Sequence, residues 1–175
     1  MPRHARHEPG DLEAYLDKAV GMGASEAREI EARTIRCEPW VRLKCRFGCG
    51  GYNKRLTCPP FTPDSDETAR AIACYRRAIL IHSDDPAIVN EVVPKLEREI
   101  FLDGYFKALG FGSGPCRLCK TCDTGARCKY PYLARPSMEA CGIDVFTTVR
   151  TNGFEIEVVR TEDEKGDYYG LILVD

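Results

Sequence analysis

The sequence predicts an α+β fold, in which a small, mostly antiparallel sheet packs with helices and carries two cysteine-rich loops. Runs of helical periodicity, short apolar runs and two aperiodic stretches rich in glycine and proline support this prediction. A chain of 175 residues fits one ordinary domain, and 43% hydrophobic residues are enough to bury a core. We therefore expect a flexible N-terminus at 1–10 and a single domain over 11–175.

The N-terminal part of this domain predicts one helix and one strand. Apolar residues recur with helical spacing over 11–20, and the glycines that follow end the pattern. The residues expected on the buried face of this helix are Leu12, Tyr15, Leu16 and Val20. A strand is expected at 29–36.

The middle of the chain predicts a capped helix and a buried strand. Asp64, with Glu67 three residues later, forms the pattern of a capping box, which predicts a helix over 64–77. The apolar run RAILIHS at 77–83 predicts a strand buried within the sheet.

The C-terminal part predicts two further helices and a hairpin. A long helix is expected over 94–109, because proline suits the first turn of a helix and Pro94 stands at its start. A short helix is expected to begin at 136–142 and to continue towards residue 150. The strands 155–160 and 168–174, joined by a polar turn, predict an antiparallel hairpin.

Two aperiodic stretches interrupt these elements, the first loop at 41–64 and the second loop at 110–142. Eight of the ten cysteines lie in them: Cys45, Cys49 and Cys58 in the first loop, and Cys116, Cys119, Cys122, Cys128 and Cys141 in the second. No secretory signal precedes them, so we expect a cytoplasmic protein whose closely spaced thiols bind metal rather than form disulfides. Cys37 and Cys74 are isolated and are expected to be ordinary packing thiols.

The cysteine spacing of the second loop is typical of an iron–sulfur site. Its gaps read C-x2-C-x2-C-x5-C, with a fifth cysteine thirteen positions later. Three thiols separated by two residues each let a loop wrap one corner of a cubane, as in the bacterial run C-x2-C-x2-C-x3-C-P. Because the last gap is longer here, either Cys128 or Cys141 completes the set.

The first loop reads C-x3-C-x8-C-P-P, which fits three corners of a second cubane. The proline after Cys58 fixes the chain beside a ligand. Eight thiolates match two 4Fe–4S clusters. Zinc is the alternative cofactor, because two zinc ions would also take eight thiolates, although a structural zinc site typically uses two separated C-x2–4-C pairs. The spacing favours iron–sulfur clusters over zinc.

Charge is distributed unevenly along the chain. The net charge is −2, yet residues 42–55 carry +5 and residues 116–135 carry +4, which leaves −11 elsewhere. Cations near the sulfurs stabilise an anionic cluster. The same cations suit an acidic redox partner or a small anionic substrate, whereas the few aromatic residues in the loops do not favour nucleic acid. No apolar run approaches the ~18 residues of a membrane span.

Three stretches share their cysteine gaps and motifs with a known family: VRLKCRFGCGGYNKRLTCPP, LEREIFLDGYFKALGFGSGPCRLCKTC and ARPSMEACGIDVFTTVRTNGFEIEV. They resemble the uncharacterised family catalogued as predicted metal-binding protein (domain of unknown function 2284), and the resemblance extends over 11–175. It implies a metal or iron–sulfur site held by the eight loop cysteines, with Cys37 and Cys74 outside the pattern. It supplies no settled reaction, so function has to be argued from the site.

Three functions are compatible with these residues. If all eight thiolates bind two 4Fe–4S clusters, the protein is an electron carrier or redox partner. If Cys45, Cys49 and Cys58 alone hold one cluster, its fourth iron is open, and desulfuration or dehydration of an anionic substrate becomes possible. Glu139 is a further candidate acid or base near a cluster, although a carboxylate at the start of a helix is the commoner explanation. If the metal is zinc, the protein is a zinc-stabilised adaptor. Electron transfer is our first expectation.

Overall fold

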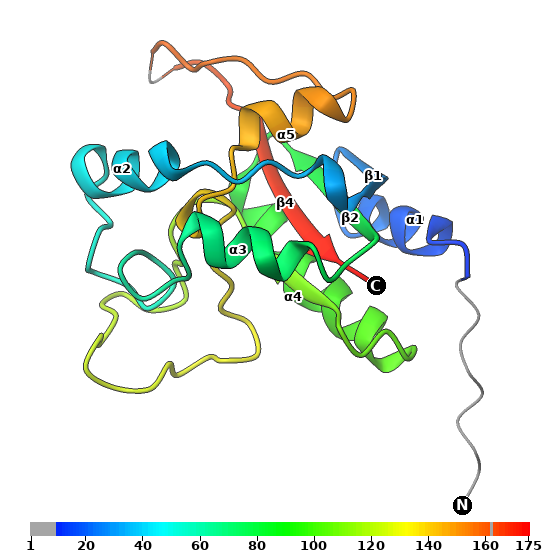
Figure 1. Cartoon of the computed structure of the whole chain (residues 1–175), viewed down its shortest axis with the longest axis horizontal. Helices are drawn as coiled ribbons and strands as arrows, with labels where there is room; N and C mark the ends of the chain where they lie inside the picture. Colours follow the sequence, from blue (N-terminus) through cyan, green and yellow to red (C-terminus); the bar gives the residue numbers. More distant parts are fainter. Residues whose placement is uncertain (1–9, 162) are drawn as a thin grey trace, which may run out of the picture.

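One antiparallel sheet with the strand order β1-β2-β4-β3 forms the centre of the molecule (Figure 1). The computed structural model describes residues 10–161 and 163–175, and it confirms the α+β class. Of the expected N-terminal segment 1–10, all but Gly10 lies outside the described residues. The strands are β1 (Glu26–Glu31), β2 (Arg77–Ser83), β3 (Leu109–Phe111) and β4 (Tyr168–Leu173). The helices are α1 (Glu13–Gly21), α2 (Pro39–Gly48), α3 (Ser65–Ile72), α4 (Pro86–Leu102) and α5 (Val145–Thr151), with the 3-10 turns η1 (Ala32–Thr34) and η2 (Glu139–Cys141).

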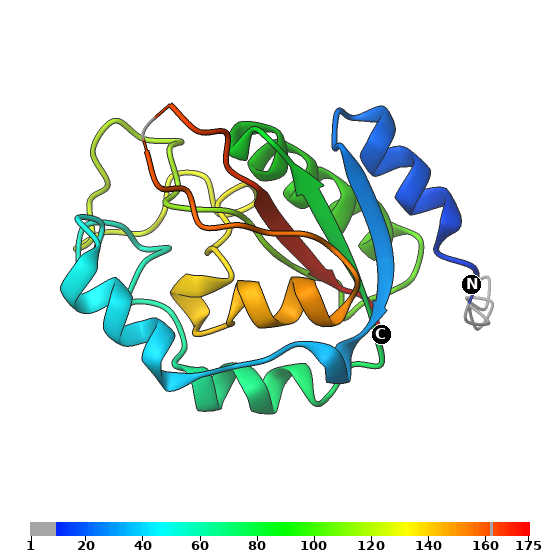
Figure 2. The same ribbon diagram turned by 90° about the horizontal axis from the view of Figure 1, so that it is seen from above.

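Helices cover both faces of the sheet (Figure 2). α1 and α4 lie on one face, and α3 and α5 lie on the other. Side chains of a strand alternate between the two faces, so β2 contributes to both cores. Ile79 and Ile81 pack towards α1 and α4, whereas Ala78 and Leu80 pack towards α3 and α5. All four are completely buried, which makes β2 a central strand.

Several expected elements are confirmed. β2 occupies the predicted range 77–83, and α3 begins where the Asp64 carboxylate accepts a 2.8 Å hydrogen bond from the Glu67 amide. α1 covers most of the predicted helix, but Val20 is exposed and Ala19 is buried in its place, because Ala19 lies one helical turn after Tyr15. The strand expected at 29–36 begins and ends earlier, since the chain turns into η1 after β1.

The long helix begins earlier than predicted. α4 starts at Pro86, where the Asp85 side chain accepts a 2.8 Å hydrogen bond from the Ala87 amide. Pro94 therefore lies inside the helix, buried, and not in its first turn. The prediction placed the helix start at Pro94 instead of Pro86, because both prolines have the fixed φ that a helix accepts at its start. Leu109, expected in this helix, belongs to β3.

The predicted C-terminal hairpin is wrong. β4 pairs with β2 on one side and with β3 on the other, and the described residues of 154–160 form no strand. β4 needs this central place because Leu171, Ile172 and Leu173 are completely buried and point to both faces. The preceding segment is attached through a side chain instead, where the Tyr169 hydroxyl donates a 2.5 Å hydrogen bond to the Glu155 carbonyl.

Two further predictions are corrected near the cysteines. The first loop is helical up to Gly48, because α2 starts with proline in its first turn and Val41 packs inward. The helix expected from 136 towards 150 is two elements, η2 and α5, separated by Gly142 at a φ of 80°. Asp144 then caps α5 by accepting a hydrogen bond from the Thr147 amide.

The two loops lie at the same end of the molecule, away from α1 (Figures 1 and 2). Apart from β3 and η2, the described part of the second loop has no helix or strand. Within the described residues, we find no helix that is both long enough and apolar enough to cross a membrane.

Candidate metal centre

Four cysteines of the second loop line one small cavity of about 20 Å³: Cys116, Cys119, Cys122 and Cys128. All four are half-buried. The Tyr130 amide donates a 3.4 Å hydrogen bond to the Cys128 sulfur, which is the type of contact that stabilises a thiolate. Cys141 does not line this cavity. The structure thus groups Cys128, and not Cys141, with the C-x2-C-x2-C trio; we call these four residues the second-loop group.

The three cysteines of the first loop line a different and larger cavity, of about 520 Å³. The Cys49 sulfur accepts a 3.4 Å hydrogen bond from the Gly51 amide. A Cβ at position 51 would lie 3.5 Å from the Cys49 sulfur and 3.7 Å from the Cys58 sulfur. Both distances are those of ordinary van der Waals contact, so this stretch of backbone lies against both sulfurs. Cys45, Cys49 and Cys58 are called the first-loop group below.

Cys141 lies beside the first-loop group but inside the apolar core. Its side chain is completely buried in the cluster that includes Met138 and Ile143. The Cys45 thiol points towards the same turn, because it donates a 3.8 Å hydrogen bond to the carbonyl oxygen of Glu139. Arg42 fixes α2 to this turn by donating to the Ala140 carbonyl and, at 2.6 Å, to the Thr62 hydroxyl.

Burial disfavours the thiolate form of three cysteines at this site. It raises the pKa of Cys45 and of Cys58, and it raises the pKa of Cys141 to about 12. Neighbouring thiols raise these pKa values further: Cys49 acts on both Cys45 and Cys58. Since the thiolate is the ligand form, metal binding at this site would release protons and satisfy the buried charge.

The two groups adjoin each other at Cys58. The pKa of Cys58 is also raised by Cys116, which belongs to the second-loop group. Arg55 connects the loops directly, because its Nη1 donates a 3.3 Å hydrogen bond to the carbonyl oxygen of Cys119. The Arg55 side chain lines the small cavity, and its positive charge partly offsets the rise in the pKa of Cys58 that burial causes. One guanidinium therefore lies between the two sets of sulfurs.

The 520 Å³ cavity is built from segments that are far apart in sequence. Trp40 and Tyr52 border it from the first loop region, Phe146 from α5 and Tyr168 from β4. A second cavity of about 620 Å³ lies between α4 and the second loop. Glu139 borders both cavities; it is half-buried, and burial raises the pKa of its carboxyl.

No ready-made site for a single metal ion is present across residues 10–161 and 163–175, since no three His, Cys, Asp or Glu side chains there are placed to hold one. The donor chemistry nevertheless fits a thiolate-bound metal ion or an iron–sulfur cluster. The donors are all thiols, two of the sulfurs accept backbone N–H groups, and Arg42 and Arg55 supply nearby positive charge.

The two isolated cysteines differ from each other. Cys37 is half-buried and packs against the core, as expected for a packing thiol. Cys74 is exposed, so its prediction as a packed thiol is wrong; α3 ends at Ile72, before this residue. Its sulfur is held near the helix by a 3.6 Å contact with the Arg70 carbonyl.

Sequence reasoning did not single out Arg55 or the aromatic lining of the 520 Å³ cavity. Arg55 was one of five cations in its segment, and nothing local distinguishes it from Lys54. The sequence carries no local signal for either feature, because both depend on contacts between distant segments of the chain.

Comparison with known proteins gives one match. The family described as predicted metal-binding protein (domain of unknown function 2284) matches residues 28–174. No curated protein and no solved structure matches the chain. The family match begins within β1, extends through β4 and includes all eight loop cysteines, and it agrees with the resemblance in the sequence motifs.

Proposed function

The chain belongs to the family of predicted metal-binding proteins, and from this we propose that it binds two 4Fe–4S clusters and carries electrons. The observation that carries the proposal is the partition of the cysteines into two adjoining groups, each beside N–H donors and cations. The proposed metal-binding unit is a single domain over 11–175.

The second-loop group would hold one cluster with four thiolates. The support is that Cys116, Cys119, Cys122 and Cys128 surround one cavity. Residues 55–57 of the first loop close this cavity from the other side. A cluster held there would be shielded from water by both loops, which is the setting that tunes a reduction potential.

The first-loop group would hold the other cluster, with Cys141 as its fourth ligand. Cys45 already points to the turn that carries Cys141, through its contact with the Glu139 carbonyl. Burial raises the pKa of both thiols, and the charge of Arg42 partly offsets this rise and would favour their thiolate forms.

When bound, such clusters supply one-electron transfer. The chain's own contribution is to keep the two groups adjacent, because Arg55 bridges the loops where Cys58 lies near Cys116. Electrons could then pass between the clusters without leaving the protein.

Serine variants of single cysteines test the two-cluster assignment. Cys119→Ser should lose one cluster and keep the other, and Cys49→Ser should do the reverse. The readout is iron per chain and the electron paramagnetic resonance spectrum of the reduced protein, with the exposed Cys74→Ser as the control. If each variant lost both clusters, or neither changed the iron content, the assignment would be wrong.

The 520 Å³ cavity favours a second function, an enzyme with an open iron in the cluster of the first-loop group. Cys45, Cys49 and Cys58 border about 520 Å³ of space, enough for a small molecule. If Cys141 stays in the core, one iron of the cluster would lack a protein ligand and would face this cavity. Lys44, which also borders the cavity, would orient an anionic substrate.

Cyanide distinguishes the two functions, because it binds an iron that lacks a protein ligand. If cyanide changes the electron paramagnetic resonance spectrum of one cluster, and this change does not occur in Cys49→Ser, the enzyme is favoured. An unchanged spectrum would favour the electron carrier. A zinc-stabilised adaptor would show neither cluster spectrum.

A further inference from the structure

α2 separates an inward face from an outward face, and only the inward face is occupied. Val41 is 4% exposed, and Cys45 points to the turn of η2. On the opposite side, Leu43 is 55% exposed and Phe47 is 78% exposed. The helix therefore presents two large apolar side chains, one turn apart, to solvent.

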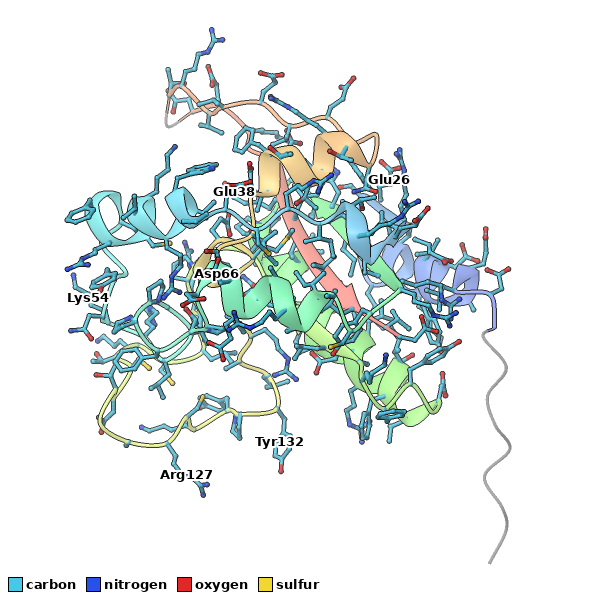
Figure 3. The ribbon with its side chains drawn as sticks, in the orientation of Figure 1. Glu26, Glu38, Lys54, Asp66, Arg127 and Tyr132 are labelled. Carbon is cyan, nitrogen blue, oxygen red and sulfur yellow. The ribbon has the colours of Figure 1, made fainter. Side chains whose placement is uncertain are left out.

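One cation contacts this apolar pair, and further cations follow in the same segment of the chain. The Arg46 guanidinium lies 5.4 Å from the centre of the Phe47 ring, and Lys54 lies at the same end of the molecule (Figure 3). Residues 41–63 contain no Asp or Glu. Among the ion pairs of the described residues, none involves Lys44, Arg46 or Lys54. We call Leu43, Arg46, Phe47 and Lys54 the α2 face.

The α2 face adjoins the first-loop group. Cys45 stands between Lys44 and Arg46 in the same helix, and Cys49 directly follows the helix. A protein docked on the outward side would be separated from these sulfurs by about the 10 Å diameter of one helix.

We propose that the α2 face docks an acidic electron-transfer protein that places an apolar patch on Leu43 and Phe47. This inference rests on the proposed function and names its partner class. A helix of ten residues is about 15 Å long, which suits the small interfaces of transient redox complexes. Unpaired cations around an apolar centre increase the association rate with an acidic partner and discriminate against a basic one.

Native and succinylated cytochrome c test the proposal, because they share one haem and one fold but have opposite surface charge. The dithionite-reduced protein, freed of excess dithionite, is mixed with each cytochrome by stopped flow. At low ionic strength we expect the succinylated form to be reduced at least about tenfold faster, since electrostatic steering changes association rates by 10–10³. The preference should disappear in 0.5 M salt.

Variants assign the effect to the α2 face. The double variant Arg46→Glu and Lys54→Glu should reverse the preference, and Phe47→Ser should slow the succinylated form without changing the salt dependence. Arg98→Glu, at an exposed arginine on α4, is the matched control and should keep most of the preference. All variants should retain the wild-type iron content.

The outcomes separate the docking surface from the proposed function. Equal rates with both cytochromes, or the same loss of preference in Arg98→Glu, would overturn the surface while leaving the electron carrier intact. A protein that reduces neither cytochrome would overturn both. A third outcome is that the protein shows no preference between the cytochromes but sediments with phosphatidylglycerol vesicles, and that the double variant does not sediment. This outcome would assign the α2 face to a membrane and overturn the protein partner.

Discussion

Arg55 in the first loop donates a hydrogen bond of 3.3 Å to the carbonyl oxygen of Cys119 in the second loop. This contact joins two segments that each carry a group of cysteines. The side chain is half-buried, whereas that of the neighbouring Lys54 is exposed. Arg55 therefore has two separable roles, as a connection between loops and as a positive charge beside both sets of sulfurs.

Arg55→Gln is expected to lower the reduction potential of both clusters, because a nearby cation stabilises the reduced, more negative form. Loss of the charged hydrogen bond should also destabilise the docked loops by about 1–2 kcal/mol. Potentiometric titration and urea unfolding measure the two effects. Lys54→Gln removes the same charge from the next residue and is the control; equal shifts in both variants would contradict the role of Arg55.

Cys141→Ala is expected to lose the cluster of the first-loop group, so that iron falls from about eight to about four per chain. Cys37→Ala, another thiol against the same core, should keep all the iron. Iron analysis of both variants, with circular dichroism to verify folding, is the measurement. Full iron content in a folded Cys141→Ala would show that Cys141 packs in the core and would favour the open-iron enzyme.

Gly142→Ala is expected to destabilise the turn that carries Cys141. Gly142 has a φ of 80°, and a Cβ there would lie 2.8 Å from the Cα of Ser65. The strain and the clash together should cost about 1–3 kcal/mol in the free energy of unfolding. Gly21→Ala is the control, since a Cβ at that position meets no atom within 4 Å. Equal denaturation midpoints for the two variants would count against this account.

The pair Arg77–Asp175 is expected to make stability fall in acid. The Arg77 guanidinium donates hydrogen bonds of 2.6 and 3.0 Å to the Asp175 carboxylate and lowers its pKa. A lowered folded-state pKa contributes stability that is present above the unfolded pKa of about 3.9 and is lost as pH falls through the folded value. Urea unfolding from pH 7 to pH 3 should show a shallower decline for Asp175→Asn. An identical pH profile would contradict the contribution of this pair.

The local part of the fold could be predicted from the sequence. The capping box at Asp64 and the apolar run of β2 specify their elements through neighbouring residues alone. The hairpin expected for 155–174 failed because the place of β4 depends on β2 and β3, which are distant in sequence. Pairing between remote strands leaves no periodic signal in either strand.

The candidate site could be predicted in part. Cysteine spacing identified the eight thiols, but it left open whether Cys128 or Cys141 accompanies the C-x2-C-x2-C trio. That choice is a matter of loop closure, since Cys128 borders the small cavity while Cys141 is held in the core by η2. The bridge from Arg55 to Cys119 spans 64 positions and was likewise out of reach of motif reasoning.

The most direct test of the central claim is the metal and acid-labile sulfide content of anaerobically purified protein, with a visible absorption spectrum. We predict about eight iron and about eight sulfide per chain, with broad brown absorbance, because each of two cubanes holds four of each. About two zinc and no sulfide would contradict the iron–sulfur account and would leave a structural metal protein.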